Sequence, residues 1–383
     1  MTPSPTRSRQ AGFSLIEIMV GLAIGMVAVI IMSQVMLQSE GAKRNTTSGD
    51  DAQINASIAL SSLERDIRMS GFGLNSYNLL GCAWTFTPSK ESSALTNALT
   101  IAPVVINPPT NLVPAGDANT DTLLVMYGSG NSPSEGDAVV AASSSTSYKV
   151  TTPTSFTTGD KTIALALPRT TNCAVSTDRV TNVPSDGTIS VATGLSGIKT
   201  GDIVYNLGAQ PIVRAYAIRN GNLTVCDYTA YNCGKSSYAS SLNSNVWVPV
   251  GSNIVSLRAQ YGHDGKEGTM AGIVTTFNQT TPVVNSAPSC AWARVLSVRL
   301  AVVGRGAQYD GEKTKSGDLS AVTDDSNAPK WAGSGSTGAP NINLASLDSW
   351  QQYRYKTVET AVPLRNMLWQ GGQPSYQGGE SGC

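Results

Sequence analysis

An uninterrupted apolar segment near the N-terminus sets the first limit on how this chain can fold. Residues 13–37 read FSLIEIMVGLAIGMVAVIIMSQVML, and no polar side chain occurs between Ile18 and Met32. A helix of this length is long enough to cross a bilayer. Arg7 and Arg9 precede the segment, and positive charge favours the cytoplasmic side. We therefore predict a single-pass membrane protein with a short cytoplasmic leader and the remaining chain on the opposite side.

Glu17 is the unusual residue of this segment. A carboxylate in the middle of a membrane costs roughly 2.5–3.5 kcal/mol, so buried acids usually have a partner. A position near the interface, where Glu17 stays hydrated, is one explanation. The other is a nearby cation, which a free α-amine would supply if the chain were cut just before Phe13. An ordinary secretory signal fits poorly, because the apolar run is too long and no small-residue cleavage site follows it.

The residues around this point resemble the type IV prepilin signal. Gly12-Phe13-Ser14-Leu15-Ile16-Glu17 follows a short basic leader, residues 1–12. The resemblance implies that prepilin peptidase cleaves between Gly12 and Phe13 and methylates the new amine of Phe13. It also implies that Glu17 pairs with the N-terminal amine of a neighbouring subunit during assembly.

The helix is predicted to continue beyond the membrane. The segment 13–38 is the membrane and assembly half, and 39–72 is an amphipathic half. One apolar stripe recurs at helical spacing in the second half, formed by Ala52, Ala56, Ala59, Leu63 and Ile67. Gly71 and Gly73 supply the stop. Gly41 and Gly49 predict a kink or a melted turn, because glycine weakens a helix interior.

The chain after Gly73 is predicted to be a β-rich head covering residues 73–369, which makes the fold class α+β. Its strongest strand patterns are 122–127, 148–150, 162–167, 212–218, 223–225, 255–261, 294–303 and 353–364. A Ser/Thr-rich region from about 85 to 200 predicts an inserted β subdomain. The segment 304–349 is predicted to be a loop, and residues 370–383 a Gly-rich tail.

The six cysteines indicate disulfides rather than a metal site, because no CxxC pair is present. They are Cys82, Cys173, Cys226, Cys233, Cys290 and Cys383. Cys226 and Cys233 would close a short loop, and this is the pairing that we predict. The pairing of the other four stays open, as does the alternative that some are buried free thiols. A disulfide through Cys383 would pin the tail.

The sequence gives little support to catalysis or to ligand binding by known motifs. There is one histidine, and no P-loop, GxGxxG, HExxH or GxSxG string. His263 precedes Asp264 and is predicted to be a solvated turn residue rather than a catalytic base. Asp117, Asn119 and Asp121 have the first spacings of a calcium loop, but Thr122 and Gly128 stand where the loop needs Gly and Glu. We expect no enzyme, no cofactor and no metal.

Several further segments resemble the PilW family of minor pilins. These are 63–68 (LERDIR) with 71–73 (GFG), then 81–82, 121–127, 260–264, 292–300 and 364–366. The resemblance implies a minor pilin at or near the pilus tip that primes or supports assembly. Its implied partners are other minor and major pilins, prepilin peptidase, the inner-membrane assembly platform and a large tip adhesin. It implies storage in inner-membrane lipid with a periplasmic head, then an extracellular pilus serving twitching motility, adhesion or DNA uptake.

Two alternatives share the same anchor. The first is a J-type pseudopilin of a type II secretion system, although that family has a smaller head. The second is an adhesive module at the pilus tip, with exposed loops near Trp331 and Trp350 as contact points. Nucleic acid is not expected as a partner, because the formal net charge is zero and there is no excess of basic residues to neutralise phosphates.

Overall fold

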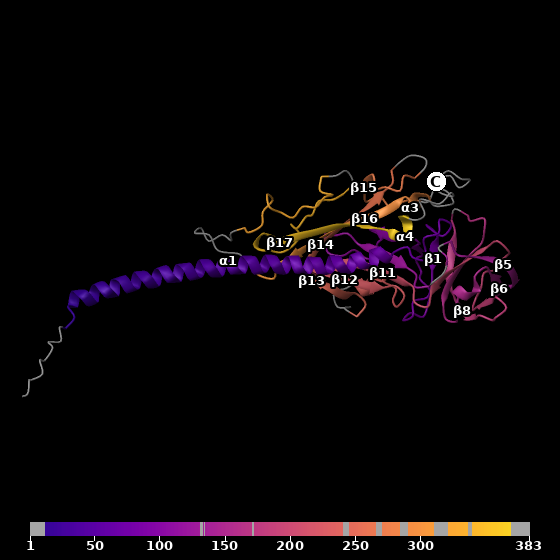
Figure 1. Cartoon of the computed structure of the whole chain (residues 1–383), viewed down its shortest axis with the longest axis horizontal. Helices are drawn as coiled ribbons and strands as arrows, with labels where there is room; N and C mark the ends of the chain where they lie inside the picture. Colours follow the sequence, from indigo (N-terminus) through magenta and orange to yellow (C-terminus); the bar gives the residue numbers. More distant parts are fainter. Residues whose placement is uncertain are drawn as a thin grey trace, which may run out of the picture.

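The computed structural model describes residues 12–130, 133, 135–170, 172–239, 245–265, 270–283, 290–309, 321–335 and 339–368, with main chain only at 42, 44 and 45. Arg7, Arg9, Cys383 and the predicted tail lie outside the described residues. One long helix carries a β head at its C-terminal half, and its N-terminal half projects away from the head (Figure 1).

The helix α1 runs without interruption over Leu15–Met69 and has 55 residues, about 82 Å at 1.5 Å per residue. The predicted kink was wrong, because the helix continues through both Gly41 and Gly49. A glycine costs a helix only about 1 kcal/mol, which the long apolar and docked segments on either side offset. The helix ends where predicted, with Gly71 at φ 78° and Gly73 at φ 70°.

Two antiparallel sheets form the head around α1. The first contains β3 (Val104–Ile106), β4 (Leu123–Tyr127), β11 (Ile212–Arg219), β12 (Asn222–Asp227) and β13 (Val248–Ser252), in the order β13-β12-β11-β4-β3. Asn220 and Gly221 join β11 to β12, both with positive φ, as expected of a tight hairpin. β4 is buried along its whole length, which is why its sequence is a continuous apolar run.

The second sheet contains β14 (Ile254–His263), β15 (Thr276–Asn278), β16 (Val295–Arg305) and β17 (Tyr355–Pro363), in the order β15-β14-β16-β17. One face of it packs on the predicted stripe of α1, of which every member is fully buried. The approach is close, since a Cβ on Gly304 would lie 2.1 Å from the carbonyl oxygen of Ala52. Glycine is therefore required at this crossing.

The opposite face of this sheet is covered by the segment predicted to be only a loop. Trp331, Ile342 and Leu344 are buried there against Ala301 and Val303 of β16. Trp331 itself is 4% exposed, whereas its neighbours Lys330 and Ala332 are exposed. An adhesive role for the exposed loop residues near Trp331 stays a prediction. Trp350 is half-buried against the same cluster. The segment has few apolar residues, but they are the ones that cover the sheet.

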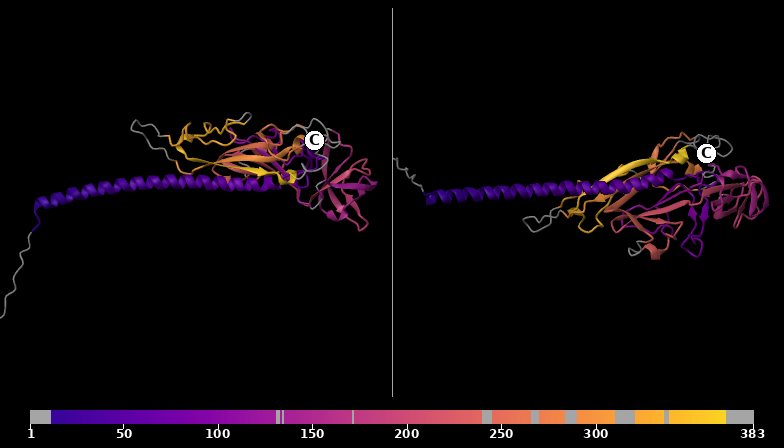
Figure 2. Two further views of the ribbon diagram at one scale, coloured as in Figure 1. Left: turned by 45° about the horizontal axis from the view of Figure 1, so that its top comes forward. Right: turned by 60° about the horizontal axis from the view of Figure 1, so that its bottom comes forward.

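A third unit is a small closed barrel. It consists of β5 (Asp137–Ser144), β6 (Ser147–Val150), β7 (Lys161–Leu165), β8 (Ala174–Asn182), β9 (Thr188–Val191) and β10 (Ile203–Gly208). Antiparallel pairing runs β10-β5-β6-β9-β8-β7 and returns to β10. Its core is separate and contains Val139, Tyr148, Val180 and Ile189. The barrel lies at the end of the molecule farthest from the free part of α1 (Figure 2).

The barrel is inserted between two neighbouring strands of the first sheet. Tyr127 at the end of β4 pairs directly with Ile212 at the start of β11, so the chain leaves and returns at one point. The predicted boundary of about 85–200 was set too early, because β3 and β4 belong to the head. Two short strands, β1 (Ala83–Thr85) and β2 (Leu99–Thr100), extend the barrel sheet through a parallel pairing of β1 with β8.

Two disulfides have both of their cysteines among the described residues of the head. Cys82 is bonded to Cys173 with their Cα atoms 5.0 Å apart, which ties the segment after α1 to the barrel. Cys226 is bonded to Cys233, the short loop expected from the sequence, with a Cα separation of 6.0 Å. Cys290 is also disulfide-bonded. The remaining elements are short helices: η1 (Pro153–Ser155), α2 (Ser236–Ala239), α3 (Cys290–Ala293), η2 (Trp350–Gln352) and α4 (Arg365–Leu368).

Candidate functional site

The candidate processing and assembly site is the start of α1. Gly12, Phe13 and Ser14 precede the helix in non-helical conformation, and the Phe13 side chain is 80% exposed. The carbonyl of Ser14 accepts hydrogen bonds from the amides of Glu17 and Ile18, at 3.0 and 3.2 Å. Glu17 therefore lies in the first helical turn, where the helix dipole favours a negative charge.

Glu17 has no ion-pair partner within the part of the chain that the structure describes. Its side chain is exposed, as are those of its neighbours along the helix. The geometry leaves its carboxylate open to a cation supplied from outside the chain.

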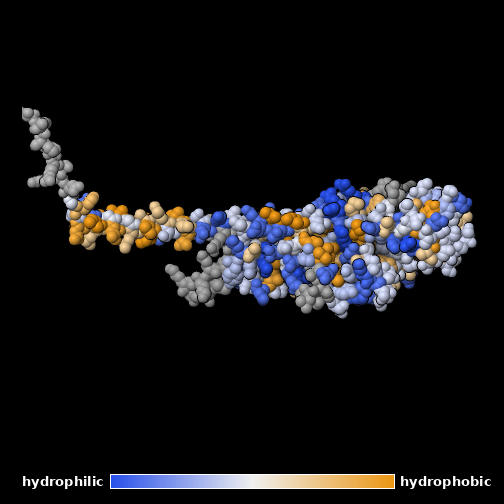
Figure 3. All heavy atoms as spheres, turned by 90° about the horizontal axis from the view of Figure 1, so that it is seen from below, coloured by the Kyte–Doolittle hydropathy of each residue, from blue (hydrophilic) through white to orange (hydrophobic). Residues whose placement is uncertain are grey.

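The apolar half of α1 makes no contact that buries it. Its large side chains are each more than half exposed: Leu15, Ile16, Ile18, Met19, Val20, Leu22, Ile24, Met26, Val27, Val29, Ile30, Ile31, Met32, Val35, Met36 and Leu37. They surround the helix on all sides rather than forming one stripe, a pattern typical of membrane spans and of helices buried in assemblies. The segment is long and apolar enough to cross a membrane, and its free apolar surface is visible in Figure 3.

The joint between helix and head contains a buried carboxylate. Asp66 is 4% exposed and accepts hydrogen bonds from Tyr127 Oη at 3.1 Å, Tyr216 Oη at 2.5 Å and Arg214 Nη1 at 2.9 Å. Burial, followed by the charge of Asp66, raises the pKa of Tyr127 to about 12. The same causes raise the pKa of Tyr216. The cluster fixes the rotation of α1 against β4 and β11.

The end of α1 is held by the last part of the head. Asn366 Nδ2 donates to the carbonyl oxygens of Met69 and Ser70, at 3.1 and 2.9 Å. The carbonyl oxygen of Asn366 in turn accepts from Asn75 Nδ2 at 2.7 Å. These bonds satisfy carbonyls that a helix terminus otherwise leaves unpaired.

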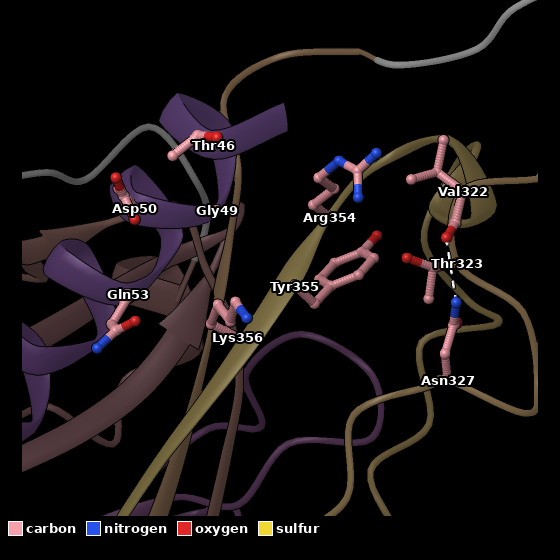
Figure 4. A pocket seen from close by; sticks show the side chains of 10 residues that line it. All are labelled: Thr46, Gly49, Asp50, Gln53, Val322, Thr323, Asn327, Arg354, Tyr355 and Lys356. Atoms are coloured by element: carbon pink, nitrogen blue, oxygen red, sulfur yellow. Dashed lines mark hydrogen bonds between the residues drawn. The ribbon is translucent and has the colours of Figure 1, made fainter. Parts of the chain in front are cut away.

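A polar cleft lies where α1 leaves the head (Figure 4). It is lined on one side by Thr46, Asp50 and Gln53 of the helix, and on the other by Arg354, just before β17, and Lys356 of β17. Charges of both signs meet here, as expected of a solvated surface beside a docked helix. The lining contains none of the three-residue His, Cys, Asp and Glu groups that hold metals, and no such group occurs among the described residues of the whole chain.

The weak calcium candidate has another use in the structure. Asp117 accepts hydrogen bonds from the amides of Asn220 and Gly221, at 2.9 and 2.8 Å. Asp121 is buried and pairs with Arg258 at 3.2 Å. Asn119 has φ 59°, so the segment is a loop whose two carboxylates anchor different strands.

The expectation of a solvated turn histidine was wrong. His263 is the last residue of β14, half-buried, with Nε2 lying 3.2 Å from Asn278 Oδ1. Burial lowers the pKa of His263, and the hydrogen bond with Asn278 opposes this only in part. Asp264 Oδ2 accepts from the amide of Gly272 at 2.7 Å, so its carboxylate anchors a turn.

Comparisons with known proteins agree with the geometry of the helix and head. The prokaryotic N-terminal methylation motif matches residues 7–33. The family described as type IV pilus-assembly protein W matches residues 216–366, which contain β12 to β17 and the contacts of Asn366. The sequence comparison with curated proteins gave no match.

Among solved structures, a type IV-like pilin from Thermus thermophilus covers 82% of this chain and 97% of its own, with 10% identity and a TM-score of 0.32. A likeness this low carries no argument about function. The matched family is a structural pilus family rather than an enzyme family. The chain therefore combines an N-terminal methylation motif, at the start of a helix long and apolar enough to cross a membrane, with a head that is similar over residues 216–366 to type IV pilus-assembly protein W.

Proposed function

We propose that the chain is a minor pilin of a type IV pilus, incorporated at or near the tip, where it primes or supports assembly. Prepilin peptidase cleaves it between Gly12 and Phe13 and methylates the Phe13 amine. Before assembly it is held in the inner membrane by α1, with the head in the periplasm. Its partners are then other minor and major pilins, the assembly platform and a tip adhesin.

The observation that carries this proposal is that the apolar N-terminal half of α1 is exposed, while the head packs on the other half. Burying apolar surface is worth about 25 cal/mol per Å², so sixteen large side chains left in water would be a severe penalty. Lipid removes the penalty in the stored state, and neighbouring pilin helices remove it in the fibre. The head already buries its own half of the helix, so it does not compete for this surface.

Glu17 sets the height at which a subunit joins the fibre when it leaves the membrane. In lipid its carboxylate is costly unless it pairs, and the described residues offer it no cation. The methylated amine of an adjacent subunit neutralises it only when that subunit is seated at the correct height. The size of the head, enlarged by the barrel, favours a position at the tip over repetition along the fibre, where its bulk would accumulate.

The first experiment measures the N-terminal residue and the mass of the mature protein from cells. We expect Phe13 as the first residue and a mass greater by one methyl group. A mature chain that keeps residues 1–12 would rule out this route and the role assigned to Glu17.

A second experiment tests assembly with two variants on the same helix. Glu17→Val should be processed and inserted but be missing from sheared pili, whereas Glu40→Gln, which removes an exposed acid of the helix, should be incorporated normally. Equal incorporation of both would contradict the register argument. Normal pili with failed exoprotein release in a deletion strain would instead indicate a type II secretion pseudopilin.

A further inference from the structure

A second cleft lies at the seam between the barrel and the head. It is lined from both sides, by strands β7 and β8 of the barrel and by β1 and the segment after it. The lining residues used below are Trp84, Phe86, Lys161, Thr177, Asp178 and Arg179. Clefts at the junction of two folding units are frequent ligand sites, and this one lies in the part of the molecule distant from the membrane helix.

Two cations face each other in this cleft. Lys161 of β7 and Arg179 of β8 are direct cross-strand partners in an antiparallel pair. Ile163 and Val175, which share their side of these strands, are buried in the core of the head, so both cations are on the outer face of the barrel. Like charges opposite one another destabilise a sheet. Neither cation has an ion-pair partner within the described ranges.

The carboxylate nearest in sequence is already occupied. Asp178 accepts hydrogen bonds from the amides of Thr193 at 3.0 Å and Gly194 at 2.5 Å, and from the amide of Arg179 at 2.7 Å. It fixes the turn after β9 rather than pairing with the two basic side chains. The charged residues among those lining the cleft, two cations and this carboxylate, leave a net positive charge of one.

An aromatic platform stands beside the cations. Trp84 is buried and donates from Nε1 to Thr177 Oγ1 at 2.8 Å. Its ring lies 4.9 Å from that of Phe86, which is half-buried at the cleft. Trp84 thus holds Phe86 in place. Hydroxyl groups from Thr87, Ser89, Thr193 and Thr229 complete the lining.

We propose that this cleft binds a carboxylate-bearing sugar, of the uronic acid class found in acidic polysaccharides. The guanidinium of Arg179 matches a carboxylate with two parallel hydrogen bonds, and Lys161 adds a second charge. The Phe86 ring accommodates the apolar face of a pyranose, and the hydroxyls exchange hydrogen bonds with its own. A nucleic-acid strand carries a phosphate at each nucleotide and needs a longer basic track than two cations beside a carboxylate.

This binding goes beyond the assembly function and does not depend on it. It is tested by calorimetric titration of the full chain in detergent micelles with tri-galacturonic acid. A neutral galactotriose and a short thymidine oligonucleotide serve as comparison probes. We expect binding of the acidic trisaccharide and at least about tenfold weaker binding of the neutral one, the factor expected when a charge-assisted hydrogen bond is lost.

Three variants and one control locate the site. Lys161→Gln, Arg179→Gln and Phe86→Ala should each weaken binding about tenfold or more. Lys149→Gln removes an exposed cation on β6 of the same barrel, outside the cleft, and should change affinity less than twofold. Melting temperatures of Lys161→Gln and Arg179→Gln should not fall, because each relieves a like-charge contact. The proposal is overturned by no binding of tri-galacturonic acid, equal binding of the neutral probe, tighter binding of the oligonucleotide, or an equal loss in Lys149→Gln.

Discussion

Replacing Asp66 with alanine tests the contacts that hold α1 against the head. The carboxylate accepts from two buried tyrosine hydroxyls and from Arg214. A hydrogen bond to a charged group contributes about 1.5–3 kcal/mol. The Arg214 side chain is 39% exposed, so water compensates most of its lost ion pair. The main cost is therefore that two buried tyrosine hydroxyls lose their acceptor. Asp66→Ala should lower the free energy of unfolding by about 3–5 kcal/mol.

The assay is urea unfolding of the full chain in detergent, followed by near-ultraviolet circular dichroism. Asp66→Asn retains an acceptor of the same shape and should lose about 1–2 kcal/mol. Glu64→Gln is the control, because it breaks only the surface ion pair with Arg68, worth about 0.3–0.5 kcal/mol. If Asp66→Ala and Glu64→Gln unfold at the same urea concentration, the cluster does not stabilise the joint and the reasoning fails.

Three further predictions concern the head. Folding raises the pKa of Tyr127 from 10.0 to about 12, so the unfolded chain loses this proton first as the pH rises. The free energy of unfolding should therefore fall between about pH 10 and 12, by on the order of 2–3 kcal/mol. Tyr127→Phe should weaken this alkaline loss of stability, as measured by melting curves at several pH values. Burial lowers the pKa of His263 below 6.5, so the unfolded chain binds this proton first as the pH falls. The melting temperature should therefore decrease as the pH falls through 6.5. The same dependence of melting temperature on pH in His263→Gln would contradict this. Gly304→Ala places a Cβ 2.1 Å from a helix carbonyl oxygen and should lower the free energy of unfolding by about 1–3 kcal/mol. Thermal unfolding measures this loss. Gly251→Ala is the comparison variant, because the atom nearest to its new Cβ is the Ala59 Cβ at 2.9 Å.

The helix and the main strands could be predicted from the sequence because their signals are local. The stripe from Ala52 to Ile67 repeats at helical spacing, and β4, β11, β14 and β16 are apolar runs or alternate. The glycine penalty at Gly41 and Gly49 is also local, but it was outweighed by the flanking helix. Propensity at two positions is a poor guide within a helix of 55 residues, because packing of its C-terminal half on the head contributes more to its stability than propensity does.

The joint and the barrel depend on contacts that no local pattern contains. Asp66 lies 61, 148 and 150 residues from Tyr127, Arg214 and Tyr216. The only local signal is that this acid stands beside Leu63 and Ile67, on the side of the helix that is buried. Closure of the barrel requires β8 to pair with both β7 and β9, and its Ser/Thr-rich strands carry few of the apolar residues that would indicate this.

The disulfide between Cys82 and Cys173 also decides how the molecule carries tension. If the chain lies at a pilus tip, as proposed, a load on the barrel must reach α1 to be resisted. A load carried through β4 and β11 would pull these two strands apart where the barrel joins them, at the pair formed by Tyr127 and Ile212. The covalent bond offers a shorter path, from the start of β8 to Cys82, which lies soon after Met69 ends α1. A force on the barrel would then pass to α1 without separating β4 from β11.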